Sequence, residues 1–171
     1  MHKITSWAFA LIIYLLIQTN GYAQIQKTQA AFIFNFALFI NWPPDYQVGD
    51  FEILVLGNTE VIKELESLTK DKKIGEQPIK VRKVLRSAEV GKGHIVFIPD
   101  YQGYLIKDVL KATDQSATLV IAEMEALGRK GAIVNFVKVE ERLKFELNLK
   151  EAEKRGLKLP EKLIKLGIPI E

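Results

Sequence analysis

The sequence contains no cysteine and only two histidines, His2 and His94. Without cysteine, neither a disulfide framework nor a thiolate metal site can form, and two histidines are too few for a histidine zinc site or a catalytic relay. The 171 residues are 48% hydrophobic and 26% charged, which is the composition of a folded globular chain. Length and composition therefore predict one compact domain and exclude a disordered chain, a collagen and a large multidomain enzyme.

The chain also lacks the sequence motifs of common enzymes. It has no phosphate-binding P-loop, no dinucleotide-binding glycine fingerprint and no nucleophile elbow. The only credible catalytic groups are His94, at the edge of a predicted buried strand, and the carboxylates Glu123 and Glu125, which follow another predicted strand. Such a histidine is more often structural, and carboxylates at that position are more often solvated. We therefore expect no enzymatic activity, no cofactor and no metal site.

One loop has the form of a weak anion site. Gly57, Asn58 and Thr59 stand between a predicted strand and a predicted helix, where backbone N–H groups can hold an anion. A single glycine is a weak signal, and Asn58 as an ordinary helix N-cap is the simpler interpretation.

Positive charge is concentrated in one segment. The chain carries 24 Lys and Arg against 21 Asp and Glu, a net charge of +3, and residues 70–86 hold seven basic and two acidic residues. Such a segment can meet nucleic acid, anionic lipid or an acidic protein, but no aromatic residues alternate with its charges to stack on bases. We predict a solvated basic face and no nucleic-acid partner.

The first 23 residues have the pattern of a signal peptide. A basic start precedes an apolar run over residues 7–17, and small residues stand at the −3 and −1 positions before Gln24. This run is shorter than the roughly 20 residues that cross a bilayer, although an uncleaved anchor is the alternative. We expect residues 1–23 to be removed, so that residues 24–171 form the exported domain.

Residues 27–40 form an apolar stretch of helical length without glycine or proline, and Pro43 and Pro44 follow it. Nearly every face of this helix is apolar, which is typical of a helix that is buried or embedded in a membrane. Because the stretch is short for a membrane span, we expect a central buried helix, or one that shares a face with a partner subunit.

The rest of the chain alternates predicted strands with predicted helices. Short apolar runs between turn residues indicate strands over 51–56, 79–84, 95–98, 117–122, 133–139 and 143–147. Helical spacing indicates helices over 59–69, 104–112, 149–155 and 161–166. This order predicts a single α/β domain with a mixed sheet of about five to six strands, helices on both faces and a C-terminal β-hairpin.

Two separated groups of motifs resemble one known family. Near its start the chain reads Lys27, Ala31-Phe32-x-Phe34-Asn35-Phe36, Phe39 and Trp42-Pro43. Near its end it reads Gly131-x-Ile133-x-Asn135-Phe136, Arg142-x-x-Phe145-Glu146-x-Asn148 and Gly156-Leu157-Lys158-Leu159. In this order, over residues 27–166, the motifs resemble those of the YfiR/HmsC-like family, also called DUF4154.

The resemblance implies a periplasmic α/β protein without enzymatic activity. The best-known members repress a membrane-bound diguanylate cyclase by binding its periplasmic domain, and so control cyclic-di-GMP output and biofilm. An outer-membrane lipoprotein relieves that repression, other members accompany membrane histidine kinases, and members are often homodimers. Here Pro160-Glu161 replaces the Ser-Ser of the family, and the lack of cysteine excludes the thiol-based control of some members.

We therefore interpret the chain as a periplasmic regulator that binds and inhibits a membrane-anchored diguanylate cyclase or histidine kinase. The alternative is a periplasmic small-ligand-binding protein that serves a sensor. Phe32, Phe36, Phe39 and Trp42 are the candidate partner-binding residues, because aromatic side chains are common anchors of protein interfaces. The competing interpretation places all four in the protein core.

Four polar residues are candidates for a ligand site or for structural roles. Asn35 lies in the apolar helix and, if buried, needs hydrogen-bond partners that tie it to a loop or line a ligand pocket. Arg142 and Asn148 are expected to hold the hairpin and to cap a helix. Lys158 is a candidate contact for an anionic ligand, although lone lysines are usually solvated.

Overall fold

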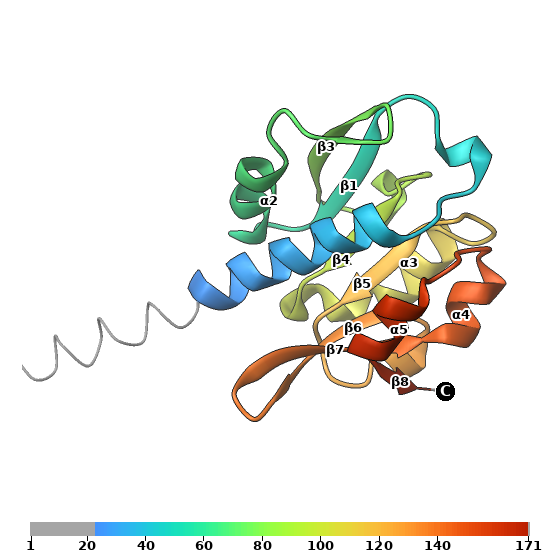
Figure 1. The fold of residues 1–171 in the computed structure, drawn as a ribbon. Coiled ribbons are helices and arrows are strands. Elements are labelled where there is room, and N and C mark those ends of the chain that lie inside the picture. Colours follow the sequence, from blue (N-terminus) through green and yellow to red (C-terminus); the bar gives the residue numbers. More distant parts are fainter. Residues whose placement is uncertain (1–22, 171) are drawn as a thin grey trace, which may run out of the picture.

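The computed structural model describes residues 23–170, so residues 1–22 of the predicted signal peptide lie outside the described residues. The described chain begins with a helix over residues 23–39, which we call the N-terminal helix and which crosses one face of the sheet (Figure 1). It starts earlier than predicted, because no glycine or proline interrupts the residues before Lys27. It ends, as expected, shortly before Trp42-Pro43.

Eight strands form one mixed sheet, whose order is β2-β3-β1-β4-β5-β6-β7-β8. The strands are β1 (Phe51–Leu56), β2 (Lys73–Ile74), β3 (Gln77–Val84), β4 (Ile95–Ile98), β5 (Leu119–Ala122), β6 (Val134–Val139), β7 (Arg142–Asn148) and β8 (Ile168–Ile170). Strands β3, β1, β4, β5 and β6 run parallel, β2 and β7 run antiparallel to their neighbours β3 and β6, and β8 pairs parallel with β7.

The predicted single α/β domain is confirmed, with eight strands in place of the five to six expected. Both extra strands, β2 and β8, are the outermost in the sheet. They were missed because they span two and three residues, too few for a periodic pattern to register. The predicted C-terminal hairpin is present as β6 and β7, joined by Glu140 and Glu141, which both have positive φ.

Four α-helices follow the N-terminal helix, each within a few residues of its predicted range: α2 (Val61–Thr69), α3 (Ile106–Ala112), α4 (Leu149–Lys154) and α5 (Glu161–Leu166). Short 3-10 helices are η1 (Pro44–Tyr46), η2 (Ser87–Glu89), η3 (Asp100–Leu105) and η4 (Gly128–Lys130). Helix α2 starts after Glu60, so Asn58 is not its N-cap as predicted. The Asn58 backbone N–H donates to the Tyr101 hydroxyl.

The sheet separates two apolar clusters, because alternate residues of each strand point to opposite faces. One cluster packs the N-terminal helix, α2, Ala152 of α4 and Leu163 of α5 against the sheet. The other packs Ile106 and Val109 of α3 against the opposite face. Helices therefore cover both faces, as predicted, and the two layers are visible in Figure 1.

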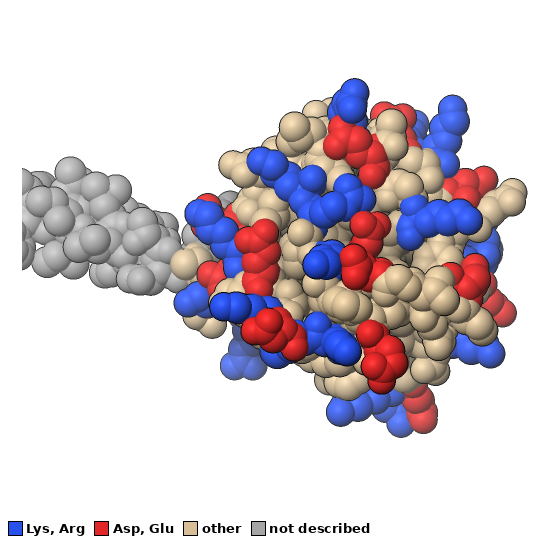
Figure 2. All heavy atoms as spheres, turned by 90° about the horizontal axis from the view of Figure 1, so that it is seen from above, with Lys and Arg blue, Asp and Glu red and all other residues tan. Residues whose placement is uncertain are grey.

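The predicted basic segment is a solvated face. All seven of its lysine and arginine side chains are exposed. Three of them form ion pairs with glutamates: Lys73 with Glu76, Arg82 with Glu52, and Arg86 with Glu89. On the face seen in Figure 2, basic and acidic side chains are interspersed rather than gathered by sign.

Candidate functional site

The predicted partner-binding aromatics divide between core and surface. Phe36 is fully buried, and its ring lies edge-on to Phe145 with a centroid separation of 5.1 Å. Trp42 is buried too, and its Nε1–H donates to the Ala37 carbonyl at 3.1 Å. Neither ring lies on the surface of this chain, because both pack against strands of the sheet: Phe36 on β7 and Trp42 on β1.

Phe32 is half-buried and packs beside Phe36. Phe39, by contrast, is 40% exposed, and the Lys162 ammonium of α5 lies 5.2 Å from its ring centroid. The exposed side chains Leu38 and Leu166 lie on the same two helices as this pair. We call Leu38, Phe39, Lys162 and Leu166 the Phe39 patch; of the four predicted aromatic residues, only Phe39 is exposed.

The four predicted polar residues do not converge on one site. Asn148 is buried, accepts from the Glu151 backbone N–H at 3.0 Å as the N-cap of α4, and donates to the Gly128 carbonyl at 3.0 Å. Asn35, Arg142 and Lys158 are all exposed. Arg142 opens β7, and the Lys158 carbonyl accepts a long backbone hydrogen bond that joins two loops.

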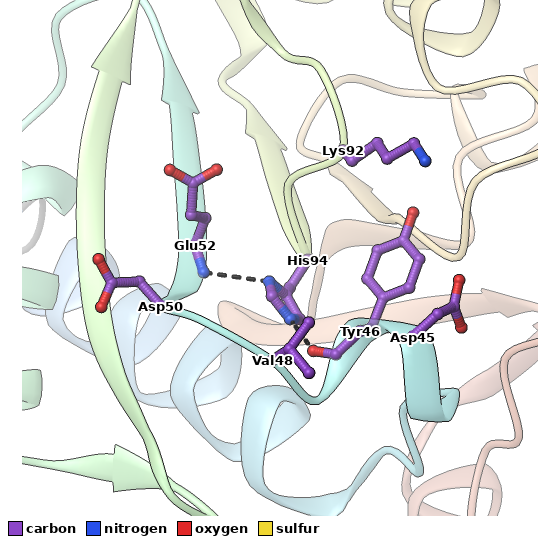
Figure 3. A pocket seen from close by; sticks show the side chains of 7 residues that line it. All are labelled: Asp45, Tyr46, Val48, Asp50, Glu52, Lys92 and His94. Atoms are coloured by element: carbon purple, nitrogen blue, oxygen red, sulfur yellow. Dashed lines mark hydrogen bonds between the residues drawn. The ribbon is translucent and has the colours of Figure 1, made fainter.

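A first cavity, of about 380 Å³, surrounds His94 and is drawn in Figure 3; it is lined by Asp45, Tyr46, Val48, Asp50, Glu52, Lys92 and His94. The His94 Nδ1 accepts from the Glu52 backbone N–H at 3.1 Å, and its Nε2 lies 2.7 Å from the Tyr46 carbonyl, to which it donates. Burial lowers the pKa of His94. The ring is therefore neutral with both nitrogens occupied, which suits a structural residue and not a catalytic base.

A second cavity lies at the carboxyl edge of the parallel strands. The chain runs from β1 to β3 on one side and then back past β1 to β4 on the other. Ligands in open α/β sheets bind outside the strand ends at such a reversal. Here a cavity of about 470 Å³, which we call the switch-point pocket, is lined by Ile25, Gln26, Gln29, Asn58, Thr59, Glu60, Pro99, Asp100, Tyr101, Glu123 and Lys138.

Glu123 is the most enclosed carboxylate of the switch-point pocket. Its Oε1 accepts from Gln29 Nε2 at 2.6 Å. Burial, with a smaller contribution from the charge of Asp100, raises the pKa of Glu123. Glu125 is exposed and is not part of the lining, so these two glutamates do not form a carboxylate pair.

Two residues that shape the pocket, Gln29 and Tyr101, were not singled out from the sequence. Gln29 is 1% exposed and reaches Glu123 from the N-terminal helix, whereas Tyr101 lies at the start of η3. Nothing local to either residue signals a site. Gly57 did carry a signal, as a lone glycine after a strand. Its φ is +83°, and a Cβ there would collide with the Tyr101 hydroxyl, so only glycine allows this close approach.

Within residues 23–170, no cluster of three or more metal-ligating side chains is placed to hold an ion. No helix in that range combines the length and the apolar character that crossing a bilayer requires.

Comparison with known proteins gives a family and a fold. The family model described as YfiR/HmsC-like (DUF4154) matches residues 26–168. No curated protein matches significantly.

Two solved structures are similar in fold. One is a conserved domain protein from Vibrio cholerae, with 14% identity and a TM-score of 0.55, matched over 71% of this chain and 55% of its own. The other is an ABC domain in complex with L-Trp from Streptococcus pneumoniae, with 13% identity and a TM-score of 0.53, matched over 70% of this chain and 55% of its own. The chain thus spans about half of each of these structures, and at such identities the likeness concerns the fold alone.

Proposed function

This chain belongs to the YfiR/HmsC-like family, and we propose from that premise that it is a periplasmic, non-enzymatic regulator that binds and inhibits a membrane-bound diguanylate cyclase or histidine kinase. The observation that carries the proposal is the family match over residues 26–168, which takes in nearly all of the described domain. A homodimer and release by an outer-membrane lipoprotein belong to the same proposal, and sedimentation velocity tests the dimer.

The candidate catalytic groups support a non-enzymatic role. Both nitrogens of His94 are engaged with backbone groups. Glu123 is tied to Gln29, and Glu125 points to solvent elsewhere.

The Phe39 patch is our proposed contact for the membrane partner. It combines an aromatic ring, two leucines and a lysine on two adjoining helices. Phe39 can be removed without opening the core, because it is 40% exposed whereas its neighbour Phe36 is fully buried. An exposed aromatic anchor of this kind often dominates the binding free energy of an interface.

A pull-down from detergent-solubilised membranes of the source cells tests both parts of the proposal. The bait is the protein purified after expression of the full chain, beside Phe39→Ala and the matched control Tyr104→Ala, which removes an exposed aromatic ring on η3. We expect the wild type and Tyr104→Ala to recover a diguanylate cyclase or histidine kinase, identified by mass spectrometry. Recovery by Phe39→Ala should fall by about tenfold or more.

The two failures are distinguishable. Equal recovery by Phe39→Ala rejects the Phe39 patch and leaves the regulator standing. Absence of any cyclase or kinase from the wild-type eluate rejects the regulator itself.

A further inference from the structure

We propose that the switch-point pocket binds a small organic cation that carries a protonated amine. This inference does not depend on the proposed regulatory function, since it rests on the geometry and charge of one cavity. It concerns a different part of the surface from the Phe39 patch.

The position of the cavity favours a ligand. It lies outside the carboxyl ends of β1 and β4, where the strand order reverses and no crossover helix can cover both strand ends. Five separate segments build its walls: the N-terminal helix, the loop after β1, the start of η3, the residue after β5, and Lys138 of β6. Its volume of about 470 Å³ falls in the range of small-molecule sites.

The charged residues that line the cavity favour a positively charged ligand. Glu60 pairs with Lys63 at 2.8 Å, and Lys138 pairs with Glu141 at 2.5 Å, so these two lining charges are neutralised nearby. Among the described residues, no lysine or arginine forms an ion pair with Glu123 or Asp100. The cavity therefore holds two carboxylates without a matching cation, and an anionic ligand would meet repulsion from both.

The remaining groups suit an ammonium. The Gln29 amide fixes the Glu123 carboxylate at 2.6 Å and so presents it in one orientation. The Tyr101 hydroxyl oxygen accepts from the Asn58 backbone N–H at 2.7 Å, and its second lone pair can accept from an ammonium N–H. The Tyr101 ring is half exposed, and an aromatic face beside carboxylates attracts organic cations.

The same carboxylates also lie near the first turns of the N-terminal helix, where negative charge is favourable without any ligand. A ligand-binding role and a purely structural role at the helix N-terminus predict different responses to an added cation. A ligand site should respond to an added cation in a saturable way, and a purely structural role should not.

The test is a two-dimensional NMR titration of the protein purified after expression of the full chain. The probe is n-butylammonium chloride, and sodium butyrate at equal ionic strength is the negatively charged control. We expect saturable amide shifts at residues 58–60, 100, 101 and 123 with butylammonium, with a Kd of about 1–10 mM for so small a fragment. Butyrate should cause no saturable shift there.

Matched variants locate the charge responsible. Glu123→Gln keeps the size of the side chain and removes its charge, so the affinity for butylammonium should fall by about tenfold or more. Glu125→Gln makes the same change two residues away on an exposed side chain outside the lining, and affinity should not change. Phe39→Ala should also bind normally, which separates this test from that of the regulator.

Three results would overturn the proposal: no saturable shift with butylammonium up to about 50 mM, equal or tighter binding of butyrate, or equal loss of affinity in Glu123→Gln and Glu125→Gln. Any of these would leave the carboxylates with the structural role at the helix end.

Discussion

Among single residues, His94 is held between two backbone groups that determine its protonation state. An N–H group points at Nδ1 and a carbonyl at Nε2, at 3.1 Å and 2.7 Å. A proton added to Nδ1 would turn the first hydrogen bond into a repulsive contact between two donors. The ring also stacks on Phe51 at 4.2 Å inside the apolar cluster, so a positive charge there would be poorly solvated.

The free energy of unfolding is therefore expected to decrease as the pH falls below about 6.5. Burial lowers the pKa of His94 in the folded protein below the ordinary value of 6.5, so the unfolded chain takes up this proton more readily. The contribution of His94 to stability is complete above pH 6.5 and is lost as the pH falls from there toward the folded pKa. Urea unfolding between about pH 7.5 and 5.5 measures this dependence.

The control is His94→Gln, which cannot titrate. Glu123 has the opposite sign, because its raised pKa gives stability that is lost as the pH rises through the folded value. The difference between wild type and His94→Gln isolates the histidine, since both proteins contain Glu123. The same pH slope in both would contradict a neutral, buried His94.

Residues 32–42 show where sequence reasoning about single residues stops. Almost every position there is apolar, so the pattern does not reveal which face of the helix meets the sheet. Phe36 and Phe39 are equivalent by type and differ only in where the sheet lies: 0% of one and 40% of the other is exposed. The clustering of aromatics was predictable, but its division into core and surface depends on the tertiary structure.

At the scale of elements, the longer strands and helices could be predicted from the sequence, whereas the shortest strands, β2 and β8, could not. Strands β1 and β4 and helix α5 have their predicted bounds, since Gly, Asn or Pro residues next to apolar runs mark their ends. Strand β8 reads Ile-Pro-Ile, and a proline argues against a strand unless that strand lies at an edge. Its edge position is a property of the sheet and not of three residues.

Helix α4 depends on its cap, because it has only six residues. Asn148→Ala removes the acceptor for the Glu151 N–H and the donor to the Gly128 carbonyl. The first turn of α4 and the 3-10 helix η4 each lose one hydrogen bond. We expect a loss of about 1–3 kcal/mol in the free energy of unfolding, measured in urea.

Asn148→Ser separates the two hydrogen bonds. Serine keeps a cap acceptor but is too short to replace the amide donor, so its stability should lie between those of the wild type and Asn148→Ala. If serine were as destabilising as alanine, the cap would not be the source of the effect.

At the scale of the whole molecule, the switch-point pocket could not be located from sequence order. The strand ends that form it come from β1, β4 and β5, and only the path of the chain past β1 brings the first two together. Glu123 was recognised from its place after a strand, whereas Gln29 arrives from a helix 94 residues earlier. Alternation of strands and helices predicts the fold class but not the strand order.

The N-terminal helix and the residues directly after it join the sheet, because their buried side chains reach from β1 to the hairpin. Trp42, three residues after the end of the helix, packs on Phe51 of β1 at 5.2 Å, and Phe36 in the helix packs on Phe145 of β7 at 5.1 Å. Phe36→Ala should therefore cost about 3–5 kcal/mol, the usual cost of emptying an aromatic site in a core. Phe39→Ala, the same change one turn later on the exposed side, should cost about 1 kcal/mol or less.

Urea unfolding followed by both Trp42 fluorescence and far-ultraviolet circular dichroism measures these changes in the free energy of unfolding. It also shows whether the helix and the sheet unfold together. If the helix joins the sheet into one cooperative unit, the two signals should share one midpoint in Phe36→Ala, shifted well below that of the wild type. Equal costs for Phe36→Ala and Phe39→Ala would mean that the buried face of this helix is assigned wrongly. Separate midpoints would mean that the helix detaches before the sheet unfolds. In that case, a loss of partner binding by Phe39→Ala could be ascribed to the Phe39 patch only after this variant had been shown to keep its helix attached.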